Sequence, residues 1–121
     1  MPDPTPPLTG DALLEAVSDA MAALHERYHH RPPASIKTQL LEDELLACVM
    51  SGVYTDVEKT MIEIQKQTIV QNTRSDFQSA MQDKFISEAE QLTGRRVMAF
   101  ISNTHVGPDV EVELFFLAPG T

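Results

Sequence analysis

The first regular pattern of apolar positions predicts a helix that starts near residue 9 and ends before two prolines. Thr9 is placed to cap this helix, and Pro32 and Pro33 cannot continue it. The apolar positions recur at steps of three and four, which is the spacing of one helical face. The residues of this stripe are Leu13, Val17, Met21, Leu24 and Tyr28.

Two short apolar segments follow and predict a pair of strands. Residues 34–41, ASIKTQLL, alternate through Ile36, Thr38 and Leu40, and residues 45–50, LLACVM, are almost continuously apolar. The acidic pair Glu42-Asp43 lies between the two segments. We therefore expect a hairpin with a tight acidic turn.

A long stretch without glycine or proline, between Gly52 and Gly94, predicts helix. Thr55 and Glu58 have the spacing of a capping box, which marks a helix start. The polar segment QKQTIVQNTRS, residues 65–75, favours a break or bend that gives two helices, with one long rod as the alternative. Gly94 ends the second helix as a left-handed cap. The stripe of that second helix is Phe77, Met81, Phe85, Ala89 and Leu92.

Residues 96–102 and 110–117 predict two further strands, joined by a loop that contains Gly107-Pro108. The element order is α-β-β-α-α-β-β, which indicates an α+β fold: a four-stranded, mainly antiparallel sheet with helices packed on it. Strict alternation divides the last two strands into two apolar faces. One face carries Val97, Ala99, Val110, Val112, Leu114 and Phe116, and the other carries Met98, Phe100 and Phe115.

In a two-layer domain, the sheet face with Met98, Phe100 and Phe115 would be exposed to solvent. Either helices cover both faces of the sheet or a second subunit covers this one. We expect a homodimer that uses these three residues as its interface.

Length and charge limit the classes of function. The 121 residues fit one domain, expected over residues 9–118 after a flexible Pro-rich start at residues 1–8. The net charge of −9 disfavours nucleic acid and anionic membranes as partners. We expect no signal peptide, no direct membrane insertion and a cytoplasmic location, because no apolar run is long enough for either segment.

The segment HERYHH contains the pattern H-E-x-x-H, through His25, Glu26 and His29, which is typical of zinc proteases. Such a site needs a third ligand and an intact helix, whereas Pro32 ends this helix at once. We expect His25 and His29 near the edge of the helix or in solvent, as cations close to its negative end. We therefore predict no metal, no cofactor and no catalytic residue.

The loop between the last two strands is the most site-like segment. Asn103, His105 and Asp109 could bind a small ligand together with Arg74 or Arg95, but we favour turn geometry as the explanation of the loop residues. Glu111 and Glu113 could do acid–base chemistry, but alternating acids more often form a solvated or interface rim. Cys48, in an apolar strand, is expected to be a buried inert thiol.

The chain resembles a bacterial family, formerly a domain of unknown function and now called MpsC, after a sodium-translocating membrane-potential-generating system. The resemblance covers about residues 10–118, and one junction departs from the family pattern, HHRPP in place of a Gly-Arg-Gly-Pro-like segment. The matching residues are Thr55, Glu58, Arg74, Phe77, Gly94, Arg95, Ser102, Pro108, Asp109, Phe115 and Leu117.

The resemblance implies a small soluble accessory or regulatory protein, with a membrane-protein partner linked to ion or bicarbonate uptake. We expect it to act by binding and not as an enzyme. The alternative is a small-ligand sensor or an enzyme that uses the 102–109 loop with Arg74 or Arg95.

Overall fold

The computed structural model describes residues 8–120 and confirms the predicted α+β order of elements. The Pro-rich start predicted for residues 1–8 lies, except for Leu8, outside the described residues. The elements are α1 (Gly10–His29), β1 (Ser35–Leu41), β2 (Leu45–Ser51), α2 (Asp56–Glu63), α3 (Gln67–Thr93), β3 (Val97–His105) and β4 (Val110–Leu117).

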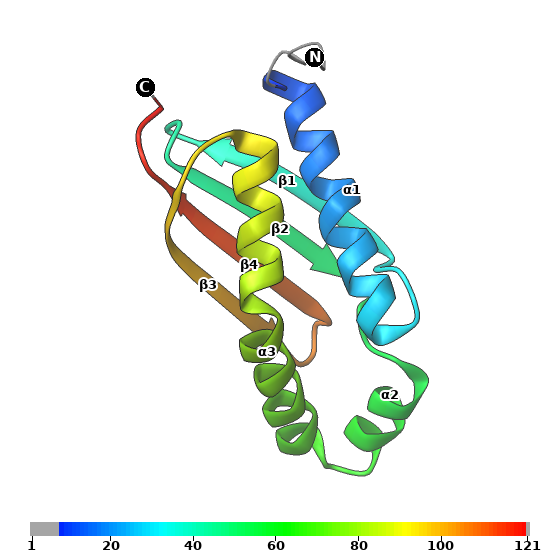
Figure 1. The fold of residues 1–121 in the computed structure, drawn as a ribbon. Coiled ribbons are helices and arrows are strands. Elements are labelled where there is room, and N and C mark those ends of the chain that lie inside the picture. Colours follow the sequence, from blue (N-terminus) through cyan, green and yellow to red (C-terminus); the bar gives the residue numbers. More distant parts are fainter. Residues whose placement is uncertain (1–7, 121) are drawn as a thin grey trace.

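The four strands form one antiparallel sheet in the order β1-β2-β4-β3. β1 and β2 are joined by the predicted acidic turn, in which Glu42 and Asp43 have positive φ angles of 54° and 55°. Figure 1 shows α1 and α3 side by side across one face of this sheet, while α2 lies beyond its end. The domain therefore has two layers, and no helix within residues 8–120 covers the other face of the sheet.

The predicted helix boundaries are confirmed, with one shift. Thr55 and Glu58 form a complete capping box at the start of α2, and Gly94 ends α3 with a φ of 66°. The break between α2 and α3 falls at residues 64–66, where Gln65 has a φ of 65°. The segment is thus two helices, and the break comes before most of the polar stretch that predicted it.

The core lies between the helices and the covered sheet face. Burying one large apolar side chain stabilises a fold by about 1.5–3 kcal/mol, so this layer supplies most of the driving force. Cys48 lies in it, and burial raises the pKa of its thiol to about 12, as expected of an inert cysteine. Other buried members are Leu13, Val17, Met21, Leu46, Met50, Met81, Phe85, Ala89, Phe115 and Leu117.

The prediction of which sheet face is covered was wrong. Phe115 is fully buried beneath the helices, and Phe100 lies between Phe85 and Phe115, with ring centroids 6.2 and 4.9 Å away. Of the three predicted interface residues, only Met98 is exposed on the other side. A β-bulge between Val97 and Ala99 interrupts the strict alternation, so Met98 and Phe100 do not share a face.

The pairing of β4 with β2 explains the other half of this error. Phe115 lies beside Leu46 and Glu113 beside Cys48, so these residues face the helices with their neighbours. Val112, Leu114 and Phe116 therefore point to the opposite face, together with Ile101 of β3. Both faces of β4 carry large apolar residues, and only the helix-covered one is fully buried.

Candidate functional site

Polar side chains, most of them ionisable, gather where α1, α3 and β4 meet. They line a small hollow of about 10 Å³, close to the volume that one water molecule needs. Apolar side chains of α3, including Met81 and Phe85, close the hollow. We call this group the buried polar cluster, and its members are His25, His29, Arg74, Gln78, Glu111 and Glu113.

Arg74 is the centre of the cluster and is only 1% exposed. Its Nε donates to Glu58 Oε2 at 2.6 Å, and its Nη1 donates to Glu111 Oε1 at 3.1 Å. Its Nη2 donates to the carbonyl of Val53 at 2.7 Å, and the guanidinium lies 5.0 Å from the ring centre of Tyr54. One buried cation thus joins α3 to α2, to β4 and to the loop before α2.

Glu58 has two roles at the base of α2. Its Oε1 accepts from the backbone N–H of Thr55 at 2.9 Å, as the capping box requires, and from Arg74 Nη2 at 2.6 Å. Burial opposes its ionisation, but the hydrogen bonds and charge of Arg74 and the Thr55 N–H outweigh burial and lower the pKa of Glu58. Glu58 is therefore the ionised partner of Arg74 at neutral pH.

The two glutamates of β4 have different surroundings. Burial raises the pKa of Glu111, although Arg74 and Gln78 hydrogen-bond to it and oppose this effect. Glu113 is fully buried, and neither of its oxygens has a hydrogen-bond partner within residues 8–120. Burial raises the pKa of Glu113 to about 8. Glu113 therefore carries a proton at neutral pH.

The two histidines of the cluster are neutral bases. Nδ1 of His25 lies 3.1 Å from the carbonyl of Arg31, and since a carbonyl only accepts, this nitrogen carries the hydrogen. Nε2 of His25 is left without a partner in the described part of the chain. Burial lowers the pKa of His25, and it lowers that of His29 to about 4.

The predicted placement at the edge of the helix or in solvent was wrong for His25, whereas His29 is half-buried. His25 is buried, because the buried row of α1 runs at steps of four through Leu13, Val17 and Met21 to His25, while Leu24 and Tyr28 flank it half-buried. Glu26 is exposed on the other side of the helix. Within residues 8–120, no three His, Cys, Asp or Glu side chains come together as metal ligands would. The H-E-x-x-H pattern here belongs to a helix that buries His25 in a polar interior and leaves His29 half-buried beside it.

The predicted ligand loop is held by contacts of its own. Asp109 accepts from the backbone N–H groups of Val53 and Tyr54 at 2.9 and 3.1 Å. His105 Nδ1 lies 3.1 Å from the Pro108 carbonyl, and the Asn103 side chain accepts from the next backbone N–H at 2.8 Å. Asp109 therefore fastens the β3–β4 connection to the loop before α2.

Arg95 lies far from that loop, at the other end of β3. It donates to the Asp43 carboxylate at 3.2 Å and to the carbonyls of Asp43 and Ala118 at 2.7 and 2.8 Å. The strand β3 lies between Arg95 and His105, and its eight steps from Val97 to His105 span about 26 Å at 3.3 Å a step. Of the five predicted ligand residues, Arg74 and Asp109 reach the same Val53–Tyr54 segment, but the set does not converge on one site.

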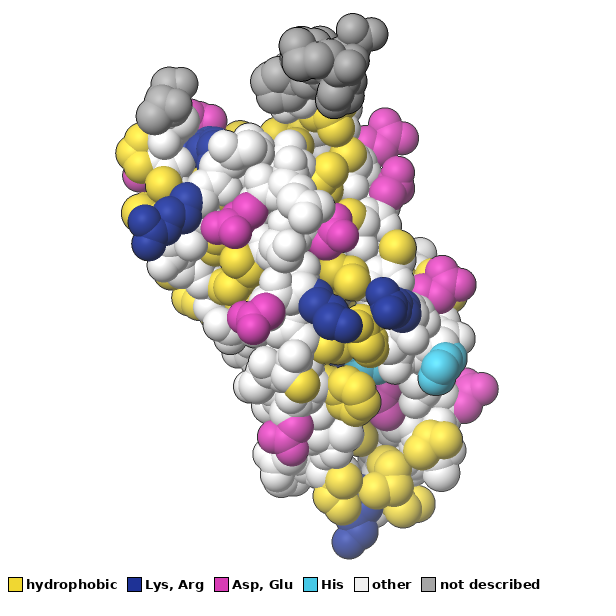
Figure 2. All heavy atoms as spheres, viewed as in Figure 1, with side chains coloured by type: hydrophobic (Ala, Val, Ile, Leu, Met, Phe, Trp, Pro, Cys, Tyr) yellow, Lys and Arg dark blue, Asp and Glu magenta, His cyan; other side chains and the backbone are white. Residues whose placement is uncertain are grey.

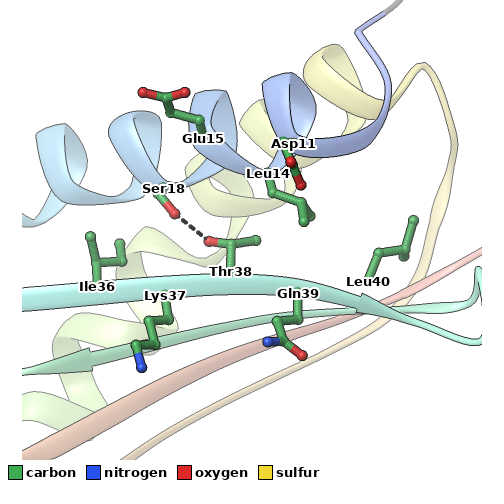
Figure 3. Close-up of a pocket in the computed structure, with 9 residues that line it drawn as sticks. All are labelled: Asp11, Leu14, Glu15, Ser18, Ile36, Lys37, Thr38, Gln39 and Leu40. Atoms are coloured by element: carbon green, nitrogen blue, oxygen red, sulfur yellow. Dashed lines mark hydrogen bonds between the residues drawn. The ribbon is translucent and has the colours of Figure 1, made fainter.

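A larger hollow, of about 490 Å³, lies between α1 and the edge strand β1. Figure 3 shows Ile36 and Thr38 directed toward α1, where Thr38 meets Ser18 in a hydrogen bond of 2.7 Å, while Lys37 points away. The hollow is open, and its acids, Asp11 and Glu15, are on the exposed side of α1. It is a shallow groove along a sheet edge and not an enclosed ligand pocket.

The fold and the cluster define a small α+β domain built around a buried ionic network. The chain belongs to the family described as Na+-translocating membrane potential-generating system (MpsC), which matches residues 9–119. This confirms the resemblance found in the sequence. No curated protein and no solved structure matches the chain. Within residues 8–120, no helix has both the length and the apolar character needed to cross a membrane.

Proposed function

We propose that this chain is an accessory protein that binds a membrane-protein component of a Na+-translocating system and does not itself catalyse a reaction. The family description supports the link to such a system. The contacts of the site-like residues support a binding role, because Arg74, Arg95 and Asp109 are each engaged in holding segments of the chain together. The sensor or enzyme alternative needs the 102–109 loop together with Arg74 or Arg95. Arg95 lies at the opposite end of β3, and the guanidinium of Arg74 is already paired with Glu58 and Glu111.

The observation that carries the proposal is an apolar helical arm, which we define as α2 and the first turns of α3, residues 56–77. Figure 1 shows this arm extending past the end of the sheet, and in Figure 2 hydrophobic side chains gather at that end. Val57, Ile64, Ile69 and Phe77 are 41% to 73% exposed there, and α2 has no buried residue. An apolar cluster on the surface of a monomer is typical of an interaction site.

The base of the arm is rigid, which favours binding. The capping box fixes the first turn of α2, and the ion pair between Glu58 and Arg74 ties that turn to α3 and, through Glu111, to the sheet. An isolated helix of eight residues would be marginal in water, so these contacts are what hold α2 in place. A surface that is ordered before binding loses less conformational entropy when the partner arrives.

The proposal is tested by site-specific photo-crosslinking in membranes of the native host. A photoreactive residue replaces Ile69 on the arm, and a matched variant carries it at Ser87, an exposed position in the other half of α3. We expect the Ile69 variant to form a crosslink whose second protein, identified by mass spectrometry, is a membrane subunit of the Na+-translocating system. Equal yields from both positions, or products with unrelated proteins only, would contradict the proposal.

A further inference from the structure

The sheet face away from the helices is apolar and exposed; we call it the open sheet face. Leu41, Val49, Met98 and Ile101 are 41% to 62% exposed on it, and Leu114 and Phe116 lie half-buried between them. These residues come from all four strands, so the apolar surface is continuous across the sheet. It is separate from the helical arm, which lies beyond the end of the sheet.

Charge distinguishes this face from the rest of the molecule. The chain has 18 acids against 9 Lys and Arg, yet no Asp or Glu points outward from the four strands, because Glu111 and Glu113 of β4 point inward. On the strands themselves, the outward ionisable residues are Lys37 and His105, toward one end of the face, while Glu42 and Glu44 of the β1–β2 turn border the other end. Two copies with a charge of −9 each repel one another least where acids are few, and on this face they are confined to the turn at one end.

The size of the face fits a second copy. Four strands about 4.8 Å apart and about seven residues long span roughly 19 by 23 Å, which is about 450 Å² per copy as a flat projection. Projecting side chains add accessible surface, so two copies bury about 1,000 Å² or more, the area at which specific interfaces begin. Two sheets also pack face to face at about 10 Å when both inner faces are apolar.

We propose that two copies of this chain pack through their open sheet faces, with the helices outside. The orientation follows from the charges at the two ends of the face. The acidic turn with Glu42 and Glu44 lies at one end, and Lys37 and His105 lie toward the other. A two-fold axis across the strands reverses the second sheet, so the acidic end of each copy lies over the Lys37 end of its partner.

A depression in the face has the shape to receive the second copy. It measures about 300 Å³, and its lining combines apolar side chains with Glu42 and Glu44 of the acidic turn. The apolar lining residues are Leu41, Leu45, Met98, Phe116 and Leu117. Close packing of two faces requires that such a hollow be filled. In the reversed orientation it lies over the end of the partner's face where the strands carry Ser35 and His105, so small and flat side chains meet its rim.

Sedimentation equilibrium of the full chain from 1 to 100 µM tests this proposal, with Ile101→Glu as the face variant and Ser79→Glu as the control. Ser79 is exposed on α3, so its variant adds the same charge on the helical side. We expect wild type and control at twice the chain mass of 13.4 kDa. Ile101→Glu should sediment as a monomer with an unchanged helical spectrum, since burying two unpaired carboxylates should weaken association by at least about 100-fold.

Each other outcome overturns the inference. A wild-type chain that stays at 13.4 kDa at 100 µM shows that no second copy covers the face. An Ile101→Glu dimer as stable as wild type shows that the dimer uses another surface. Should Ile101→Glu lose its helical spectrum, Lys37→Glu is the replacement, because it leaves the apolar positions intact and removes the charge match at both ends. An unchanged Lys37→Glu dimer then refutes the proposed orientation and face together.

Discussion

Replacing Glu113 by glutamine should stabilise the protein, and the gain should grow with pH. The folded chain holds a proton on Glu113 up to a pKa of about 8, against an ordinary value of 4.5. Glutamine has nearly the same shape and carries no ionisable proton. At neutral pH the carboxyl group ionises in the unfolded chain but not in the folded one, which favours unfolding. The glutamine variant removes this effect.

The sign and size follow from proton linkage. Because the pKa of Glu113 is higher in the folded chain than in the unfolded one, its contribution to folding stability is fully present below about pH 4.5. That contribution is lost as the pH rises through about 8. Each pKa unit corresponds to about 1.4 kcal/mol, so the gap between the two values amounts to about 4–5 kcal/mol at its full extent. We expect Glu113→Gln to match wild type near pH 5 and to exceed it by about 2–4 kcal/mol at pH 8.

Urea unfolding followed by circular dichroism at pH 5, 6, 7 and 8, at one fixed protein concentration, measures this difference. Glu63→Gln is the control, because Glu63 is exposed on α2 and its replacement should leave the pH dependence unchanged. The reasoning is refuted by parallel wild-type and Glu113→Gln curves. It is refuted as well by a glutamine variant that is less stable at pH 8, since Glu113 would then be ionised and stabilised.

Three further substitutions test the rest of the buried network. Arg74→Met should lower the free energy of unfolding in urea by about 3–5 kcal/mol, because Glu58 and Glu111 lose their cation. Adding Glu111→Gln should restore part of that loss. An Arg74→Met variant as stable as wild type would contradict the network. Asp109→Ala should lower the free energy of unfolding by about 1–3 kcal/mol, because two hydrogen bonds are lost. Asp109→Asn should lower it by less. Equal losses in the two variants would show that the carboxylate geometry does not matter. Because the pKa of His29 is lowered to about 4, its contribution to stability is fully present above pH 6.5 and is lost as the pH falls toward 4. Between pH 6.5 and 4.5, the free energy of unfolding of His29→Asn should therefore fall by about 2 kcal/mol less than that of wild type. Equal acid sensitivity of the two proteins would refute this.

Much of the fold could be predicted from the sequence because local signals were strong and consistent. The capping box at Thr55 and Glu58, the glycine at position 94 and the acidic turn at Glu42-Asp43 each specify a backbone geometry almost alone. These signals placed the helices, the strands and their order. They do not depend on what packs against them.

The choice of covered face could not be predicted by the same reasoning, because both faces of β4 are apolar. Apolarity favoured Val112 and Leu114 as core, whereas the structure buries Glu111 and Glu113. The covered face is decided by strand pairing between distant segments. Thr38 pairs with Cys48, and Cys48 pairs with Glu113, so all three side chains point to the same face of the sheet. Following that register from β1 would have placed both glutamates inward.

The candidate site was missed for a related reason. Histidine and glutamate are expected at the surface, so His25, Glu111 and Glu113 were assigned to an edge or a rim. The row of steps of four through Leu13, Val17 and Met21 does lead to His25, and it is the signal that could have placed it inside. Arg74 was predicted to bind a small ligand, and the structure shows that its guanidinium forms ion pairs with two glutamates of the same chain.

The central claim, that the chain works by binding a membrane subunit through its helical arm, is tested most directly by affinity purification from native membranes. The bait is wild type, the arm variant Ile64→Asp with Ile69→Asp, or the control Ser87→Asp, each checked for an unchanged circular dichroism spectrum. We predict that wild type and control recover a membrane subunit of the Na+-translocating system and that the arm variant recovers at least about 10-fold less, a loss of about 1.4 kcal/mol in binding. Equal recovery of that subunit by all three baits would contradict the account.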